Sequence, residues 1–66
     1  MKTSFYFIGW RDQGNPRKIT RKAAQELFGT ERFKQAMADA KATFMEDPCV
    51  SNEFMVTGGR IEITFS

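Results

Sequence analysis

The C-terminal segment 53–66 restricts the fold of this chain more than any other part of it. Two short runs of β-branched and aromatic residues flank Gly58–Gly59, and the two glycines can supply the positive φ angles that tight hairpin turns need. With these glycines as the loop, apolar residues of the two strands pair on one face: Val56 with Ile61 and Phe54 with Ile63. A slip of one residue would turn the apolar side chains of one strand to the wrong face. We therefore predict a β-hairpin that packs one face against the rest of the protein.

The segment Ser4–Trp10 has the composition of a first strand, and both of its faces are apolar. Phe5 and Phe7 fall on one face. The other face carries Tyr6, Ile8 and Trp10. A strand with one face in water would alternate apolar and polar residues, so this strand needs a second cover or a partner.

Two helices are predicted between the first strand and the hairpin. The segment 11–18 is predicted to be a loop, because Gly14-Asn15-Pro16 is typical of turns. Thr20 is expected to cap the first helix and Gly29 to end it, after which Thr30 caps the second helix. Pro48 stops the second helix. Its apolar positions recur at helical spacing, at Phe33, Ala36, Met37, Ala40 and Phe44.

The predicted order is strand, helix, helix, strand, strand. We expect a single α+β domain over residues 1–66, with two layers: two helices packed on one face of a three-stranded antiparallel sheet. We expect the C-terminal strand to occupy the centre of that sheet.

The chemistry that the composition permits is narrow. The chain has one cysteine, Cys49, and no histidine, so it lacks the ligands of an ordinary zinc site and the usual acid–base group of an enzyme. No phosphate-cradling glycine motif is present. We expect a non-enzymatic protein without a metal or another cofactor. No apolar run has the length of a membrane helix, and a lone cysteine favours a reducing compartment, so we expect a cytoplasmic protein.

Basic residues gather in one segment. Residues 11–22 contain five basic side chains and one acid, whereas the rest of the chain has five basic side chains and seven acids. Because this segment runs into a helix N-terminus, it could bind an anion or the phosphates of a nucleic acid. The alternative is a solvated loop that keeps the protein soluble. The candidate anion-binding or nucleic-acid-binding residues are Arg11, Arg17, Lys18, Arg21, Lys22 and Arg60.

The outward face of the first strand is the second candidate surface. Exposed aromatic residues on a sheet can anchor a protein interface or stack on bases. The sequence leaves open whether these aromatics are exposed or are covered by the loop 11–18. The candidate partner-binding residues are Tyr6, Ile8, Trp10 and Met55.

Three functions fit these features. We favour a small binding module that occupies a surface of a protein or nucleoprotein complex, as a phage or mobile-element accessory protein would do to inhibit a host or defence complex. The first alternative is a small DNA- or RNA-binding regulator that uses the basic segment 11–22. The segment Thr20–Met37 resembles a helix-turn-helix in outline, but no helix precedes it and Glu31 occupies the tip that should meet the bases. The second alternative is a structural homodimer subunit.

Overall fold

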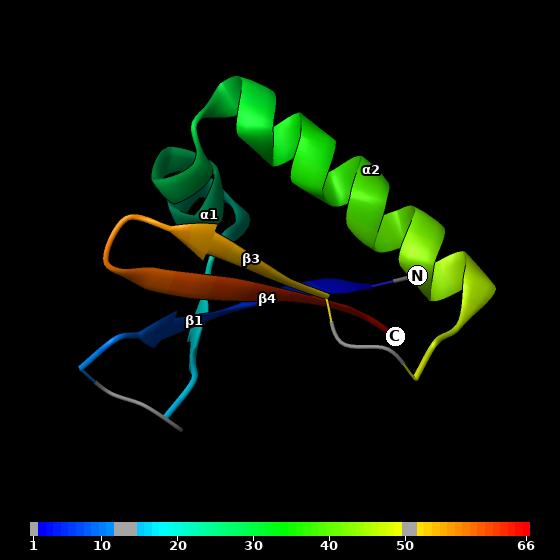
Figure 1. Ribbon diagram of the computed structural model, residues 1–66, viewed down its shortest axis with the longest axis horizontal. Coiled ribbons are helices and arrows are strands. Elements are labelled where there is room, and N and C mark those ends of the chain that lie inside the picture. Colours follow the sequence, from blue (N-terminus) through cyan, green and yellow to red (C-terminus); the bar gives the residue numbers. More distant parts are fainter. Residues whose placement is uncertain (1, 12–14, 50–51) are drawn as a thin grey trace.

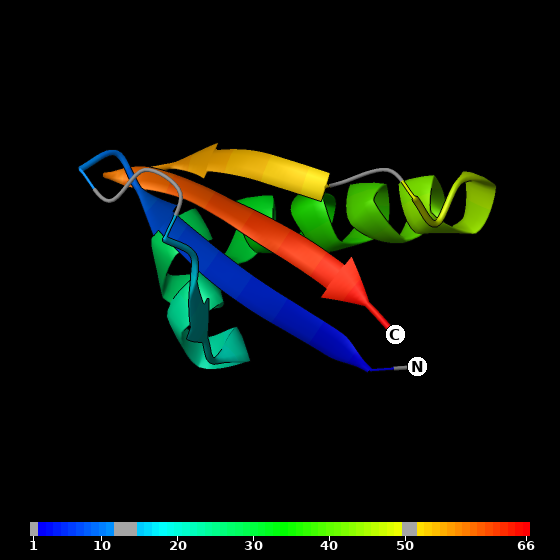
Figure 2. The same ribbon diagram turned by 90° about the horizontal axis from the view of Figure 1, so that it is seen from below.

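The chain folds into two layers, with both helices on the same side of an antiparallel sheet. The computed structural model describes residues 2–11, 15–49 and 52–66. In Figure 1 the helices lie above the sheet, and Figure 2 shows the opposite face of the sheet with the helices behind it. The elements are β1 (Thr3–Gly9), β2 (Arg17–Ile19), α1 (Arg21–Phe28), α2 (Thr30–Glu46), β3 (Asn52–Val56) and β4 (Gly59–Phe65). The predicted α+β class and the single two-layer arrangement of two helices on one sheet face are confirmed.

The sheet has four strands rather than the three predicted, in the order β2-β1-β4-β3. The additional strand, β2, takes its first two residues from the predicted loop 11–18 and its third, Ile19, from the position directly before the predicted helix cap. Its three residues pair with Phe5–Phe7 of β1, and this pairing places Ile19 beside Phe5 on the core side. A strand this short carries no readable alternation of its own, and it is stabilised by its pairing with β1 and by the packing of Ile19 on the core.

β4 lies between β1 and β3, which confirms the predicted central position of the C-terminal strand. β1 pairs with β4 along its whole length, from Thr3 with Phe65 to Gly9 with Gly59. Beyond these pairs, Lys2 and Ser66 exchange two backbone hydrogen bonds of 2.7 and 2.8 Å. The two ends of the described chain are therefore held together by the centre of the sheet.

The hairpin of β3 and β4 has the predicted faces but a different turn. The loop is Thr57–Gly58, so Val56 pairs with Gly59 and Phe54 with Ile61. Of the two loop residues, only Gly58 has a positive φ, of 83°. Among the common two-residue turns, this fits the second central position of type II. Since the register differs from the prediction by two residues, every side chain keeps its predicted face.

Gly59 belongs to the strand because the neighbouring strand comes very close to it. A Cβ atom at this position would overlap the backbone carbonyl of Ile8 and lie 2.9 Å from the Cα of Gly9. Only glycine fits such an approach. The second glycine therefore permits strand contact, and the first one makes the turn.

The two helices begin in different ways. The Thr20 hydroxyl accepts a hydrogen bond of 3.1 Å from the N–H of Ala23, as predicted for an N-cap. The prediction that Thr30 caps α2 is wrong: Thr30 is the first helical residue, and Gly29 occupies the N-cap without a side-chain bond. Gly29 also ends α1 with a φ of 84°, so one glycine serves both helices.

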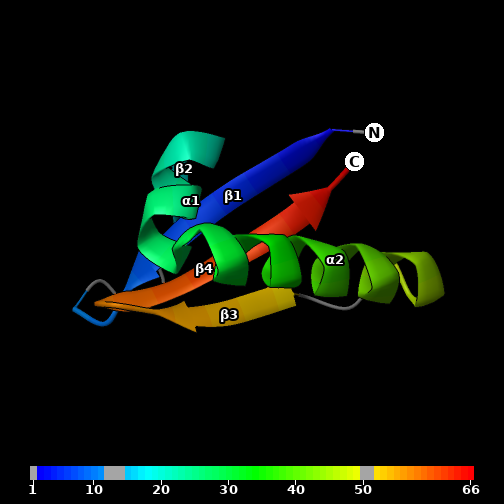
Figure 3. The same cartoon turned by 90° about the horizontal axis from the view of Figure 1, so that it is seen from above.

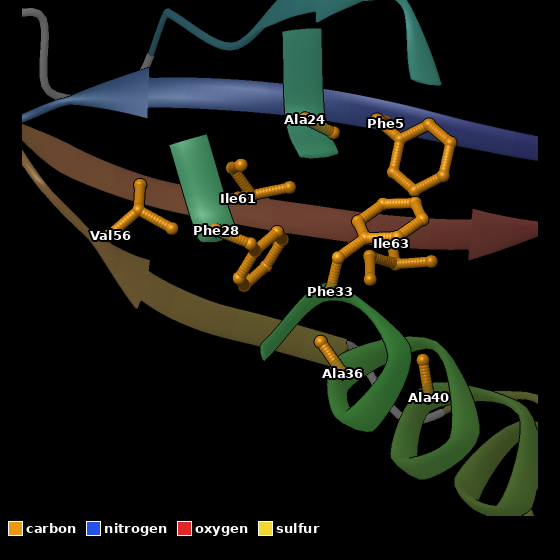
Figure 4. Close-up of a cluster of buried hydrophobic side chains, with 9 residues drawn as sticks. All are labelled: Phe5, Ala24, Phe28, Phe33, Ala36, Ala40, Val56, Ile61 and Ile63. Carbon is orange, nitrogen blue, oxygen red and sulfur yellow. The ribbon is translucent and has the colours of Figure 1, made fainter. Parts of the chain in front are cut away.

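The core lies between the helices and the sheet. Figure 3 shows α1 over the β1 side of the sheet and α2 crossing the β4 and β3 side. Aromatic rings from both layers meet there, with the Phe33 ring 5.8 Å from Phe5 and 6.1 Å from Phe28. Figure 4 shows the buried cluster: Phe5, Ala24, Phe28, Phe33, Ala36, Ala40, Val56, Ile61 and Ile63.

Candidate functional site

The face of the sheet opposite the helices, which we call the open face, is covered by no helix or strand of the described residues (Figure 2). Side chains of neighbouring strands form rows across it, because paired residues point to the same side. One row contains Lys18, Tyr6, Glu62 and Glu53, and the next contains Ile8, Arg60 and Met55. The open face therefore combines aromatic, apolar and charged groups.

The predicted aromatic row is only partly exposed. Trp10 is 45% exposed and Met55 is 68% exposed. Tyr6 is half-buried, and Ile8 is buried although it lies on the open face. Trp10 donates its backbone N–H to Gly58, whereas Met55 pairs with Arg60 of the same hairpin. The exposed apolar groups thus gather at the hairpin end of the sheet, with buried Ile8 opposite Arg60 in the neighbouring strand.

Two glutamates occupy directly opposite positions of β3 and β4 on the open face. Glu53 and Glu62 are a direct cross-strand pair, an arrangement that destabilises a sheet when both are ionised. Arg60 offsets part of this repulsion, because its Nε lies 3.5 Å from a carboxylate oxygen of Glu53. The Nε atom has no hydrogen-bond partner in the described part of the chain, so the contact is an ion pair without hydrogen-bond geometry. The Arg60 and Glu53 side chains are 38% and 42% exposed. Because water screens such a pair, it stabilises the fold only weakly.

The structure does not collect the predicted basic residues on one surface. Arg17 and Lys18 are consecutive in β2, so their side chains leave opposite faces of the sheet. The guanidinium of Arg21 lies on the helix side, 5.9 Å from the ring centre of Phe5 and 5.7 Å from that of Phe33. Arg60 is on the open face beside Glu53. The remaining two, Arg11 and Lys22, are exposed.

A groove of about 750 Å³ brings some of these basic residues together with a residue that the sequence did not single out. It lies where β2 ends and the chain turns into α1, next to the N-terminal half of β1. Three basic residues line it, namely Lys2, Lys18 and Arg21, and none of its lining residues is acidic. Its apolar lining comes from Phe5, Ile19 and Ala23. We call this hollow the cationic groove.

The cationic groove could not be found from the sequence because it depends on β2. With 11–18 taken as a loop, nothing places Lys18 beside the start of β1, where Lys2 lies. Lys2 itself carries no pattern that distinguishes it from a solubilising charge. Arg32, which donates to the carbonyl of Met55, also carries no signal in the sequence. Only the pairing of β3 with β4 shows that this carbonyl faces away from the sheet.

The remaining reactive and ionisable groups form no cluster. Cys49 is exposed, and its backbone N–H donates to the Asp47 carboxylate at 3.1 Å. Across residues 2–11, 15–49 and 52–66, no three side chains of His, Cys, Asp or Glu are placed to share a metal ion. Neither helix in the described ranges has the length and apolar character needed to cross a membrane.

The comparisons with known proteins identify no relative. No family model matches the chain, and neither a curated protein nor a solved structure is significantly similar to it.

Proposed function

We propose that this protein is a non-enzymatic binding module that contacts a protein partner through its open face. The observation that carries this proposal is the position of the exposed large apolar side chains. Met55 lies on the open face at the hairpin end of the sheet, and Trp10 follows β1 at the same end, where its backbone N–H donates to Gly58. Tryptophan supplies a large contact area at little cost in side-chain entropy, and it is enriched among residues that dominate interface energies.

The charges of the open face favour a protein over a nucleic acid. The row that contains Tyr6 also contains Lys18, Glu62 and Glu53, so a base stacked on Tyr6 would bring its phosphates toward two carboxylates as well as one ammonium group. A protein surface can instead offer an apolar pocket for Trp10 and basic groups for the glutamates. The partner expected here therefore has an apolar pocket bordered by basic side chains.

Binding of this kind would act by occupying a surface of the partner. Inhibition of a host or defence complex by a phage or mobile-element protein stays a prediction from size and composition. The DNA- or RNA-binding regulator and the homodimer are the competing functions, and each has a distinct outcome in the experiment that follows.

The test compares three tagged proteins in extracts of the cells that produce this chain: the wild type, Trp10→Ala and Met45→Ala. Met45 is the matched control, because it is 73% exposed and belongs to α2 in the other layer. Quantitative mass spectrometry should find proteins that the wild type and Met45→Ala capture, that Trp10→Ala loses, and that nuclease treatment does not release.

Other results would contradict the proposal. Release by nuclease would support the nucleic-acid regulator. If Trp10→Ala and Met45→Ala capture the same proteins in equal amounts, the open face is excluded as the binding surface. A mass in solution of twice 7.6 kDa that Trp10→Ala reduces to the monomer would instead assign the open face to a homodimer.

A further inference from the structure

We infer that the cationic groove binds an extended acidic segment of a protein, which adds to the free edge of β1. This inference concerns a different surface from the open-face contact of Trp10 and does not depend on it. Three observations carry it: the charge of the groove, the backbone of Thr3, and the apolar residues of its lining.

The charge of the groove selects an anion. Lys2, Lys18 and Arg21 line it. The ion pair found among the described residues is Arg60 with Glu53, so no described carboxylate lies within 4 Å of the charged atoms of these three side chains. Arg21 is also held in place, because its guanidinium packs over the Phe5 and Phe33 rings. A positioned guanidinium loses less freedom when it binds a carboxylate than a free side chain does.

The backbone of β1 presents an unpaired edge to the groove. Lys2 directs both of its backbone groups toward β4, because it exchanges two hydrogen bonds with Ser66. Backbone groups alternate in direction along an antiparallel strand, so the N–H and C=O of Thr3 point the other way. On that side β2 pairs with Phe5–Phe7 only, and the N-terminal end of β1 extends past both β2 and α1 (Figure 3). Thr3 can therefore form two hydrogen bonds with an added strand.

The two faces of an added strand would meet different surroundings. Lys2 and Lys18 belong to the open-face side, since Lys18 pairs with Tyr6 and Lys2 alternates with Thr3. Phe5 and Ile19 belong to the helix side, where Ala23 also lines the groove. The Arg21 guanidinium also lies on the helix side, so that side joins one cation to the apolar groups. A bound segment should thus carry acidic residues on the side of Lys2 and Lys18 and mainly apolar residues on the other. Nucleic acid fits less well, because a phosphodiester chain cannot pair with a strand edge.

The test uses a capped peptide of alternating glutamate and valine, titrated into the isotope-labelled protein and followed by NMR. The amide of Thr3 should shift among the most strongly, together with Ile19. Lys2→Glu and Lys18→Glu should each raise the dissociation constant about tenfold, the loss expected for one charge-assisted contact. Lys34→Glu is the matched control, because Lys34 is exposed on α2 and does not line the groove. Trp10→Ala should leave the affinity unchanged, which separates this site from the open face.

Two modified ligands test the proposed geometry. A peptide with glutamine in place of glutamate should bind at least about tenfold more weakly, and so should a peptide methylated at the backbone nitrogens that would pair with Thr3. The proposal is overturned if the peptide causes no shift at Thr3, or if Lys34→Glu weakens binding as much as Lys18→Glu. It is also overturned if the methylated peptide binds equally well, or if an oligothymidylate of the same charge binds more tightly.

Discussion

The guanidinium of Arg32, in the first turn of α2, donates a hydrogen bond of 2.9 Å to the backbone carbonyl of Met55 in β3. β3 is an edge strand, and the residues that flank its two-residue turn, Val56 and Gly59, form a hydrogen-bonded pair. The backbone groups of Met55 therefore point away from the sheet. Arg32 occupies one of the outward carbonyls that could otherwise pair with another chain, which protects this edge.

Replacement of Arg32 should both destabilise the fold and expose this edge. Arg32→Gln removes the bond to Met55 and the contact of the guanidinium with the Phe28 ring, 5.9 Å away. We expect a loss of about 1 kcal/mol in the free energy of unfolding, measured by urea denaturation. Light scattering at high protein concentration should also detect more self-association. Lys34→Gln, a nearby change on α2 without a described bond to β3, should alter neither; equal stability of the two variants would contradict the role of Arg32.

The two consecutive glycines should respond differently to alanine. Gly59→Ala pushes a methyl group into the backbone of Ile8 and Gly9, so the two central strands must separate. Gly58→Ala meets no atom within 4 Å and is opposed only by its positive φ. We expect about 1 kcal/mol of destabilisation for Gly58→Ala and clearly more, about 3 kcal/mol or loss of folding, for Gly59→Ala. Thermal unfolding followed by circular dichroism measures both, and the reverse order would show that the turn lies at Gly58–Gly59 after all.

These glycines also show how far the sequence determines the fold. The alternation of apolar residues around them is enough to predict a hairpin and its buried face. It does not fix the turn, because a shift of two residues leaves every side chain on the same face. What selects the observed register is the close approach of Gly59 to β1, and this is a contact between segments that are distant in the sequence.

The candidate surfaces were predictable to different degrees. Trp10 and Met55 follow from strand alternation, and the structure exposes both. Ile8 follows the same alternation but is buried, because exposure depends on what surrounds a residue as well as on its direction. The cationic groove was not predictable, since β2 depends on tertiary contacts: its pairing with β1 and the packing of Ile19 on the core. Local patterns therefore identified the residues of the open face, whereas the groove required tertiary structure.

Thr20 and Thr30 stand at the starts of the two helices, and only Thr20 caps its helix with a side-chain hydrogen bond. Thr20→Ala removes the hydroxyl that accepts from Ala23 and should destabilise the protein by about 1 kcal/mol. Thr30→Ala should cost nothing and can stabilise α2 slightly, because Thr30 is a helical residue without a described cap bond and alanine has the higher helix propensity. Urea unfolding of the two variants measures the difference. Equal losses would restore Thr30 as the cap of α2.

The paired glutamates of the open face should make the protein more stable when one of them is neutralised. Glu62→Gln removes the negative charge opposite Glu53 but keeps the shape of the side chain, and Arg60 still pairs with Glu53. We expect the free energy of unfolding to rise by about 0.5 kcal/mol at low ionic strength, with a smaller gain in high salt because salt screens the repulsion.

Glu31→Gln is the control, and its expected effect has the opposite sign. Glu31 lies in the first turn of α2, where a negative charge interacts favourably with the helix dipole. Loss of this charge should therefore destabilise the protein by about 0.5 kcal/mol. If Glu62→Gln lowers stability, the two carboxylates do not repel each other in the folded protein. A gain in stability would instead show that the cross-strand pair of glutamates lowers the free energy of unfolding while both are charged.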